Sequence, residues 1–316
     1  MADKKVIAVL GATGAQGGGL VRAIMADKSG EFTARALTRD INSDKANALK
    51  NLGAEVVAYN VDDYESLKAA FKDTYGVFAV TFFWEHFSAE KEIEEAKLIA
   101  KAAKETGIKH VIWSTLEDTR KWIPLSDNRM PTLQGKYKVP HFDGKGEAEK
   151  YFTEQNLPVT FLLTSGYWEN MIYFGWGPTR GQDGKLALNL PLGERKLPGI
   201  GVEDIGKSAY SIFKRGNEFI GKKIGIAGGH LTGKQMADSL TNALGEEVAY
   251  NAVPFDVYRS FGFPGADDVG NMFQFKHDFE DYYCGARDLK FSKSLNPELK
   301  TFDEWLKENA KKIPLK

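Results

Sequence analysis

The chain contains only one cysteine, Cys284, among its 316 residues. A single cysteine cannot form an internal disulfide, so we expect a cytoplasmic location, or a nuclear one, where thiols stay reduced. No apolar run reaches the roughly 18 residues of a membrane span. The first residues lead directly into a predicted strand, without the pattern of a secretory signal peptide. We therefore expect no membrane contact.

An excess of charge of either sign is also absent. The 42 Lys and Arg residues balance 43 Asp and Glu residues, so the formal net charge is −1 at pH 7. A nearly neutral chain has no overall field that would attract nucleic acid, and we expect no direct nucleic-acid partner. The five histidines lack the spacing of metal ligands, and no metal site is predicted.

Glycine, in contrast, is concentrated near the N-terminus. Gly11, Gly14 and Gly17 follow an apolar run at 6–10, and a helix is predicted at 18–26. The first glycine permits a sharp turn, the second lets the backbone approach a pyrophosphate, and the third lets helix and strand pack closely. The helix N-terminus offers free N–H groups to phosphate. This pattern predicts a dinucleotide site; the alternative is a tight turn without a ligand.

The end of the second predicted strand bears on which dinucleotide binds. Folds that prefer NAD usually place a carboxylate here, which holds the ribose 2′-hydroxyl. This chain has Thr38 and Arg39 instead, followed by Asp40. Because a guanidinium can bind a 2′-phosphate through two hydrogen bonds, the sequence favours NADP(H) over NAD(H) as the cofactor.

Strands and helices alternate along the first half of the chain. Strands are predicted at 6–10, 32–37, 55–59, 76–83, 110–114 and 158–163, and the helices between them at 18–26, 44–52, 64–72, 88–105 and 140–151. This alternation indicates an α/β fold, a Rossmann-type doubly wound parallel sheet. We assign residues 1–160 to the dinucleotide-binding domain. Residues 161–316 are expected to return strands to the sheet and to form a smaller α+β C-terminal lobe for substrate or partner, whose last helix begins with a capping box at Thr301 and Glu304.

Three side chains are candidates for catalysis. Ser114 ends a predicted central strand, and His141 and Lys145 lie one turn apart on the next helix. Reductases of the short-chain type use a serine at a strand end and Tyr-x-x-x-Lys on the following helix, where the tyrosine transfers a proton. Here His141 replaces that tyrosine. A histidine can act as acid or base near neutral pH, but the favoured interpretation is a polar residue of the cleft without a catalytic role, so no catalytic residue is assigned firmly.

Several longer stretches resemble the NmrA-like family of atypical short-chain dehydrogenases/reductases, including its NADP-binding redox sensors. They are the glycine turn, the stretches 37–39 and 53–57, His141–Glu147, the pair Glu169 and Asn170, and Gly262–Ala266. The resemblance implies a cofactor site along the chain. Its residues would be Gly11, Ala12, Thr13, Gly14, Ala15, Gln16 and Gly17 at the pyrophosphate; Thr38 and Arg39 at the 2′-phosphate; Asn60 and Val61 at the adenine; Thr81, Phe82 and Phe83 at the central ribose; Lys145 at the nicotinamide ribose; and Tyr167, Trp168, Glu169 and Asn170 at the nicotinamide.

The chain also departs from the family pattern, and two functions stay open. Asn60 stands where a close relative carries aspartate, and Glu94 stands where a lysine is expected near the cofactor. One function is an NADP(H)-binding regulator, a monomer or homodimer, that reports the redox state of the cofactor to a partner protein without turnover. The other is an NADPH-dependent reductase of small carbonyls or quinones. The missing tyrosine favours the regulator.

Overall fold

The computed structural model describes residues 4–315. They divide into two compact units. Of these residues, the first unit comprises 4–118, 141–163 and 205–224, and the second comprises 119–140, 164–204 and 225–315. Residues 119–140 thus belong to the second unit, whereas the expected dinucleotide-binding domain, 1–160, includes them. The chain passes between the units several times, so neither unit is one continuous segment.

A seven-stranded sheet forms the centre of the first unit, in the order β11-β6-β5-β4-β1-β2-β3. Its neighbouring strands from β6 to β3 all pair in parallel. Because β1 lies between β4 and β2, the strand order reverses beside it, and the carboxyl ends of strands at such a point bind ligands in open α/β sheets. The strands are β1 (Lys5–Val9), β2 (Phe32–Thr38), β3 (Glu55–Ala58), β4 (Gly76–Ala79), β5 (His110–Thr115), β6 (Val159–Leu163) and β11 (Lys223–Gly225).

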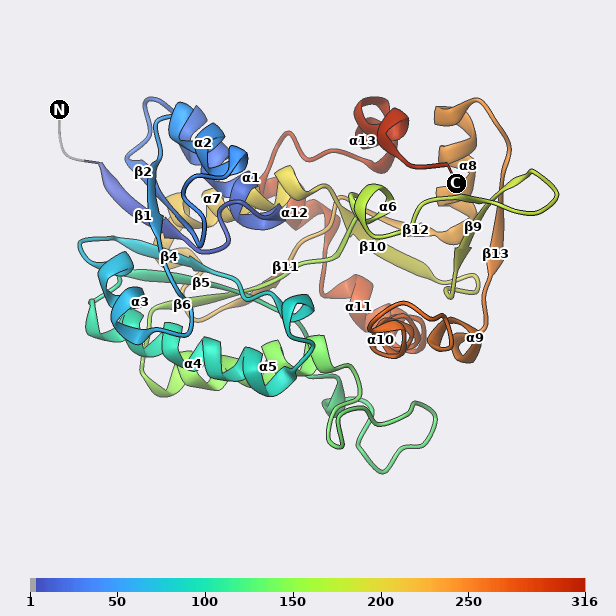
Figure 1. Cartoon of the computed structure of the whole chain (residues 1–316), viewed down its shortest axis with the longest axis horizontal. Helices are drawn as coiled ribbons and strands as arrows, with labels where there is room; N and C mark the ends of the chain where they lie inside the picture. The colour runs from blue at the N-terminus through green and yellow to red at the C-terminus, as the bar shows by residue number, and fades with distance from the viewer. Residues whose placement is uncertain (1–3, 316) are drawn as a thin grey trace. The chain divides into compact units, whose positions relative to one another are not determined.

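Helices cover both faces of this sheet (Figure 1). One face carries α1 (Ala15–Ala26), α2 (Asp44–Asn51) and α7 (Val202–Arg215), and the other carries α3 (Tyr64–Phe71), α4 (Ala89–Glu105) and α5 (Pro140–Glu154). Every residue of β4 and β5 is buried, as expected for strands covered on both faces. The predicted fold class, a doubly wound α/β sheet, is confirmed.

The second unit is mixed α and β, with two three-stranded sheets. One has the order β12-β10-β7 and the other β13-β9-β8. The capping box predicted at Thr301 and Glu304 is present at the start of α13. The strands of the second unit are β7 (Gly166–Tyr167), β8 (Thr179–Arg180), β9 (Leu186–Leu190), β10 (Lys196–Ile200), β12 (Gly229–Thr232) and β13 (Val248–Ala252). Its helices are α6 (Asn170–Tyr173), α8 (Gly233–Leu244), α9 (Phe255–Arg259), α10 (Ala266–Asp278), α11 (Glu280–Gly285), α12 (Leu289–Leu295) and α13 (Phe302–Asn309).

The apolar run at 76–83 forms a shorter strand than its composition predicts. Strand β4 ends at Ala79, opposite Trp113 of β5. The chain then leaves the sheet and forms the 3-10 turn η1 (Phe83–Glu85). Phe82 is 54% exposed, so the end of this run lies at the carboxyl edge of the sheet instead of inside it.

Among residues 4–315, no helix has both the length and the apolar character needed to cross a membrane.

Helices α7 and α1 pack with their backbones in contact, which requires a glycine at position 206. A Cβ atom added to Gly206 would lie 2.1 Å from the carbonyl carbon of Gly19 and 2.3 Å from the backbone nitrogen of Leu20. We expect Gly206→Ala to lower the free energy of unfolding by about 2 kcal/mol or more, because the helices must move apart. Urea unfolding measures this loss. The control is Gly285→Ala in α11, where the added Cβ meets nothing within 4 Å; equal stability of the two variants would contradict the packing.

Candidate functional site

The glycine turn after β1 has the backbone geometry that its spacing predicts. Gly11 has a φ of +60°, which glycine adopts without strain. A Cβ atom on Gly17 would lie 2.5 Å from the carbonyl oxygen of Gly11, so helix α1 begins in direct contact with the turn. Gly14 is the N-cap of α1, without a side-chain cap, and the first turn of α1 carries no acidic residue. Uncapped N–H groups at this edge suit an anion such as a pyrophosphate.

Ser114 and Gln16 meet beside the glycine turn. The hydroxyl of Ser114, near the end of β5, donates a hydrogen bond of 2.8 Å to Oε1 of Gln16 at the start of α1. Both side chains are buried. Ser114 therefore lies where the sequence predicts it, at the carboxyl edge of the sheet. The sequence did not reveal its bond to the glycine turn.

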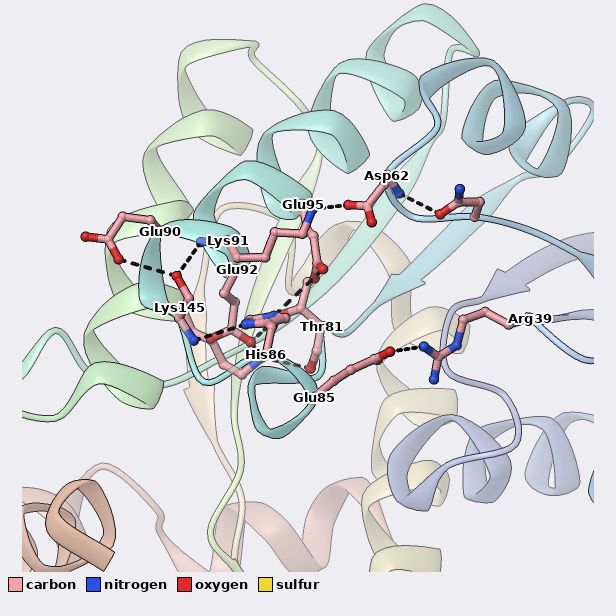
Figure 2. Close-up of polar contacts among 12 residues, drawn as sticks. Arg39, Asp62, Thr81, Glu85, His86, Glu90, Lys91, Glu92, Glu95 and Lys145 are labelled. Carbon is pink, nitrogen blue, oxygen red and sulfur yellow. Dashed lines mark hydrogen bonds and ion pairs between the residues drawn. The ribbon is translucent and has the colours of Figure 1, made fainter. Parts of the chain in front are cut away.

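The adenine side of the predicted site contains an ion pair that sequence reasoning missed. Arg39 directly follows β2, and its guanidinium pairs with the carboxylate of Glu85 in η1 (Figure 2). The side chains of Arg39 and Glu85 are 65% and 48% exposed. Asn60 and Val61 follow β3, where Asn60 accepts a hydrogen bond of 3.1 Å from the backbone of Asp62. The ends of β2 and β3 thus carry the residues expected near the adenosine.

Lys145 is buried at the centre of a polar cluster (Figure 2). Its Nζ donates to Oγ1 of Thr81 at 2.8 Å and to the carbonyl oxygen of Thr81 at 3.1 Å. It also lies 2.7 Å from Oε1 of Glu92, which accepts a second hydrogen bond from the Thr81 hydroxyl. An ammonium group has three donors, and these contacts use all three. The indole nitrogen of Trp113 donates to the Lys145 carbonyl oxygen at 3.3 Å, which fixes the backbone of α5 here.

Two more titratable side chains, Glu95 and His86, lie close to the Lys145–Glu92 ion pair. Burial, and then the negative charge of Glu92, raise the pKa of the Glu95 carboxyl to about 7. His86 has Nε2 3.8 Å from Oε1 of Glu95, and burial lowers its pKa. The second oxygen of Glu92, Oε2, is buried and has no hydrogen-bond partner among the described residues. The cluster therefore holds two carboxyl groups against one ammonium group, with little solvent to separate them.

The spacing of Glu92 and Glu95 in the sequence indicates that both are buried, which composition alone does not reveal. Both are buried on α4, together with Ala96 and Ile99, and this spacing places them on the apolar stripe of the helix. Glu94, in contrast, is exposed. A carboxylate on an apolar stripe is rarely buried without a partner, and this rule would have indicated a buried cation such as Lys145.

His141 is enclosed by aromatic rings. It lies on α5, one turn before Lys145, as the sequence predicts, and only 6% of it is exposed. Its ring centroid lies 4.8 Å from that of Trp84, 5.8 Å from that of Phe83 and 4.7 Å from that of Phe142. This packing is that of a core aromatic residue, and it leaves little room for a substrate at the imidazole.

The residues predicted at the nicotinamide, 167–170, lie in the second unit. Trp168 is 4% exposed and packs on Phe302 and Trp305, with centroids 5.4 and 6.1 Å away. Glu169 accepts a hydrogen bond of 2.8 Å from the Trp305 indole, and burial raises the pKa of its carboxyl. Trp168 and Glu169 therefore help to hold the second unit together. The position of residues 167–170 at the nicotinamide stays a prediction.

The raised pKa of Glu95 makes stability depend on pH. The folded protein holds this proton up to about pH 7, whereas a free glutamate loses it near 4.5. Stability is therefore lost as the pH rises from 4.5 to 7, and the full loss is present above pH 7. We expect Glu95→Gln to raise the free energy of unfolding at pH 8 by on the order of 2 kcal/mol, and far less at pH 5.

Urea unfolding at pH 5 and pH 8 measures this difference. The matched control is Glu94→Gln, which removes an exposed carboxylate one residue away on the same helix, and we expect it to have no such dependence on pH. An equal gain for Glu95→Gln at both pH values would contradict the assignment.

Comparison with known proteins agrees with this architecture. The sequence profile of the NmrA-like family matches residues 3–306. An NmrA-like family domain-containing protein of Dictyostelium discoideum is 27% identical, over 97% of this chain and 98% of that protein. The NmrA-like family domain-containing oxidoreductase lnbB of Aspergillus flavus is 24% identical over 98% of both chains.

A solved structure shares the fold across the whole chain. NmrA, described as a negative transcriptional regulator, was solved in complex with NADP and also with NAD. It superposes with a TM-score of 0.80 at 22% identity, over 98% of this chain and 96% of that one. Because the family profile spans nearly the whole sequence and the fold is that of NmrA, the chain belongs to the NmrA-like family.

Proposed function

We propose that this protein binds NADP(H) at the carboxyl edge of its seven-stranded sheet and acts as a redox-sensing regulator with little or no dehydrogenase turnover. The observation that carries the proposal is the position of Arg39, which directly follows β2. Strand β2 is the neighbour of β1, the strand that leads into the glycine turn, and β4 lies on the other side of β1. A guanidinium in that place can bind the 2′-phosphate that distinguishes NADP from NAD.

The residues present fit such a cofactor. The start of α1 suits a pyrophosphate, because its N-cap, Gly14, makes no side-chain hydrogen bond and its first turn carries no acidic side chain. Lys145 is the cation available for the nicotinamide ribose. It must then exchange one of its bonds to Thr81 or Glu92 for a ribose hydroxyl, since its three donors are already used. NmrA, which shares this fold, was solved with NADP and with NAD, and this supports a dinucleotide as the cofactor.

The same residues argue against efficient turnover. A bound nicotinamide supplies hydride transfer, but a carbonyl substrate also needs a proton donor. His141 replaces the usual tyrosine and is packed among Trp84, Phe83 and Phe142. The hydroxyl of Ser114 already donates a hydrogen bond to Oε1 of Gln16. Neither group is free to protonate a substrate in this arrangement.

A regulator must pass the state of the cofactor to a partner protein. NADP and NADPH differ only at the nicotinamide ring, and a ligand shifts a protein between two states only by its different affinity for them. Residues 167–170 stay the predicted contact with that ring. The partner is a regulatory protein in the cytoplasm or nucleus, and the protein meets it as a monomer or homodimer.

A reductase of small carbonyls or quinones is the second candidate function. The oxidoreductase description of the Aspergillus flavus relative favours it. An exposed aromatic side chain, Phe82, lies in the loop between β4 and η1 and could pack on a flat substrate. This candidate requires His141 to serve as the acid.

The first prediction from this proposal concerns the choice of cofactor. We expect the protein to bind NADPH and NADP more tightly than NADH and NAD. Arg39→Ala should weaken NADP binding by roughly tenfold or more, because a charged bidentate contact contributes on the order of 2 kcal/mol, and should hardly change NAD binding. Isothermal titration calorimetry with both cofactors measures this. Equal affinities of the parent protein for NADP and NAD would contradict it.

The second prediction concerns turnover. We expect slow NADPH oxidation across a panel of quinones, aldehydes and ketones, because general acid catalysis contributes about a hundredfold to ten-thousandfold and its usual donor is missing. Absorbance at the reduced nicotinamide band measures the rate. A fast rate that His141→Ala abolishes, with NADPH binding unchanged, would establish the reductase and assign His141 as the acid.

A further inference from the structure

The Arg39–Glu85 ion pair joins two loops across the glycine turn. In the sheet, β1 lies between β4 and β2. Glu85 ends η1, which follows β4, and Arg39 directly follows β2, so their pair spans the position where the chain leaves β1. Figure 2 shows the two side chains reaching toward each other from these loops.

Backbone hydrogen bonds place the end of β2, and with it Arg39, beside the glycine turn. The N–H of Ala12 donates to the carbonyl oxygen of Leu37 at 3.2 Å, and the N–H of Tyr59, which follows β3, donates to the carbonyl oxygen of Thr38 at 3.1 Å. Burial is the main reason that the pKa of Tyr59 is raised, and the charges of Arg39 and Glu85 also act on it, in opposite directions. Both members of the pair therefore lie near Tyr59 at the carboxyl edge of the sheet, beside the turn that the pyrophosphate would contact.

The chemistry of the pair concerns the 2′ position of that adenosine. A guanidinium binds a carboxylate and a phosphate with the same planar set of donors, and Glu85 already contacts one of the two terminal nitrogens of Arg39. A free 2′-hydroxyl has the opposite requirement, because NAD-binding folds hold it with a carboxylate. In this chain the carboxylate at the edge comes from the loop after β4 and not from the end of β2.

Resting on the proposed NADP(H) site, we propose that Glu85 is a specificity-determining residue. Its carboxylate competes with the 2′-phosphate of NADP(H) for Arg39 and accepts a hydrogen bond from the 2′-hydroxyl of NAD(H). NADP(H) therefore binds more tightly once the Arg39–Glu85 contact is given up, whereas NAD(H) binds with the pair intact. The ion pair therefore makes the preference for NADP(H) over NAD(H) smaller than Arg39 alone would make it.

The test compares cofactor affinities in Glu85→Gln and in a matched control. Since the pair is about half exposed and such pairs contribute little, we expect NADP to bind about two- to fivefold more tightly to Glu85→Gln, with NAD unchanged or weaker. The control is Glu31→Gln, which breaks the exposed Lys5–Glu31 pair at the amino ends of β1 and β2. It removes the same charge at the opposite end of the sheet, and we expect both affinities to stay at the parent values.

A second comparison tests whether the effect of Glu85 depends on Arg39. In an Arg39→Ala background, Glu85→Gln should no longer improve NADP binding relative to NAD, because the guanidinium for which the two anions compete is gone. Calorimetric titrations of the parent, the single variants and the double variant with NADP and NAD give all the values.

The titrations distinguish a failure of the proposed function from a failure of the inference about Glu85. A parent protein that binds neither NADP nor NAD overturns the proposed function, and this inference with it. A parent that binds NADP while Glu85→Gln leaves the ratio of the two affinities unchanged overturns the inference alone. An equal gain in Glu31→Gln would also overturn it, because the effect would then come from net charge.

Discussion

The contact between Gly17 and the backbone of Gly11 is the constraint on which the candidate site depends. A Cβ atom at position 17 would lie 2.5 Å from a carbonyl oxygen, so only glycine lets α1 begin against the end of β1. This close start directs the uncapped N–H groups of α1 to the carboxyl edge of the sheet. It also brings Gln16 within 2.8 Å of Ser114 on β5. One backbone contact therefore links the glycine turn to the neighbouring strand ends.

The loop after β4, residues 80–85, makes contacts with charged side chains at both of its ends. Thr81 receives two hydrogen bonds from Lys145, which also pairs with the fully buried Glu92. Glu85, at the other end of the loop, pairs with Arg39. The two contacts differ in strength, since the removal of one partner from a buried pair leaves an uncompensated charge, while an exposed pair contributes little. The Lys145 end is therefore the stronger anchor of this loop, and the Arg39 end is the weaker one.

Much of the fold could be predicted because it depends on local patterns. The spacing of Gly11, Gly14 and Gly17, the alternation of strands and helices, and the capping box at Thr301 all concern residues close together in the chain. The apolar run at 76–83 was misleading, because apolar composition does not distinguish a buried strand from a loop with aromatic side chains. Only the pairing with β5, which ends at Ala79, separates the two.

The sequence by itself determined the sheet class, the glycine turn, the cation after β2 and the presence of Lys145 on the helix that follows Ser114. Their signals are periodicity and spacing, which local backbone geometry sets. Only the tertiary structure decided which charges meet. Arg39 and Glu85 are 46 positions apart, and Lys145 and Thr81 are 64 apart. Such pairs arise because parallel strands place the ends of distant segments at one edge, and the strand order that selects the partners is a property of the folded sheet.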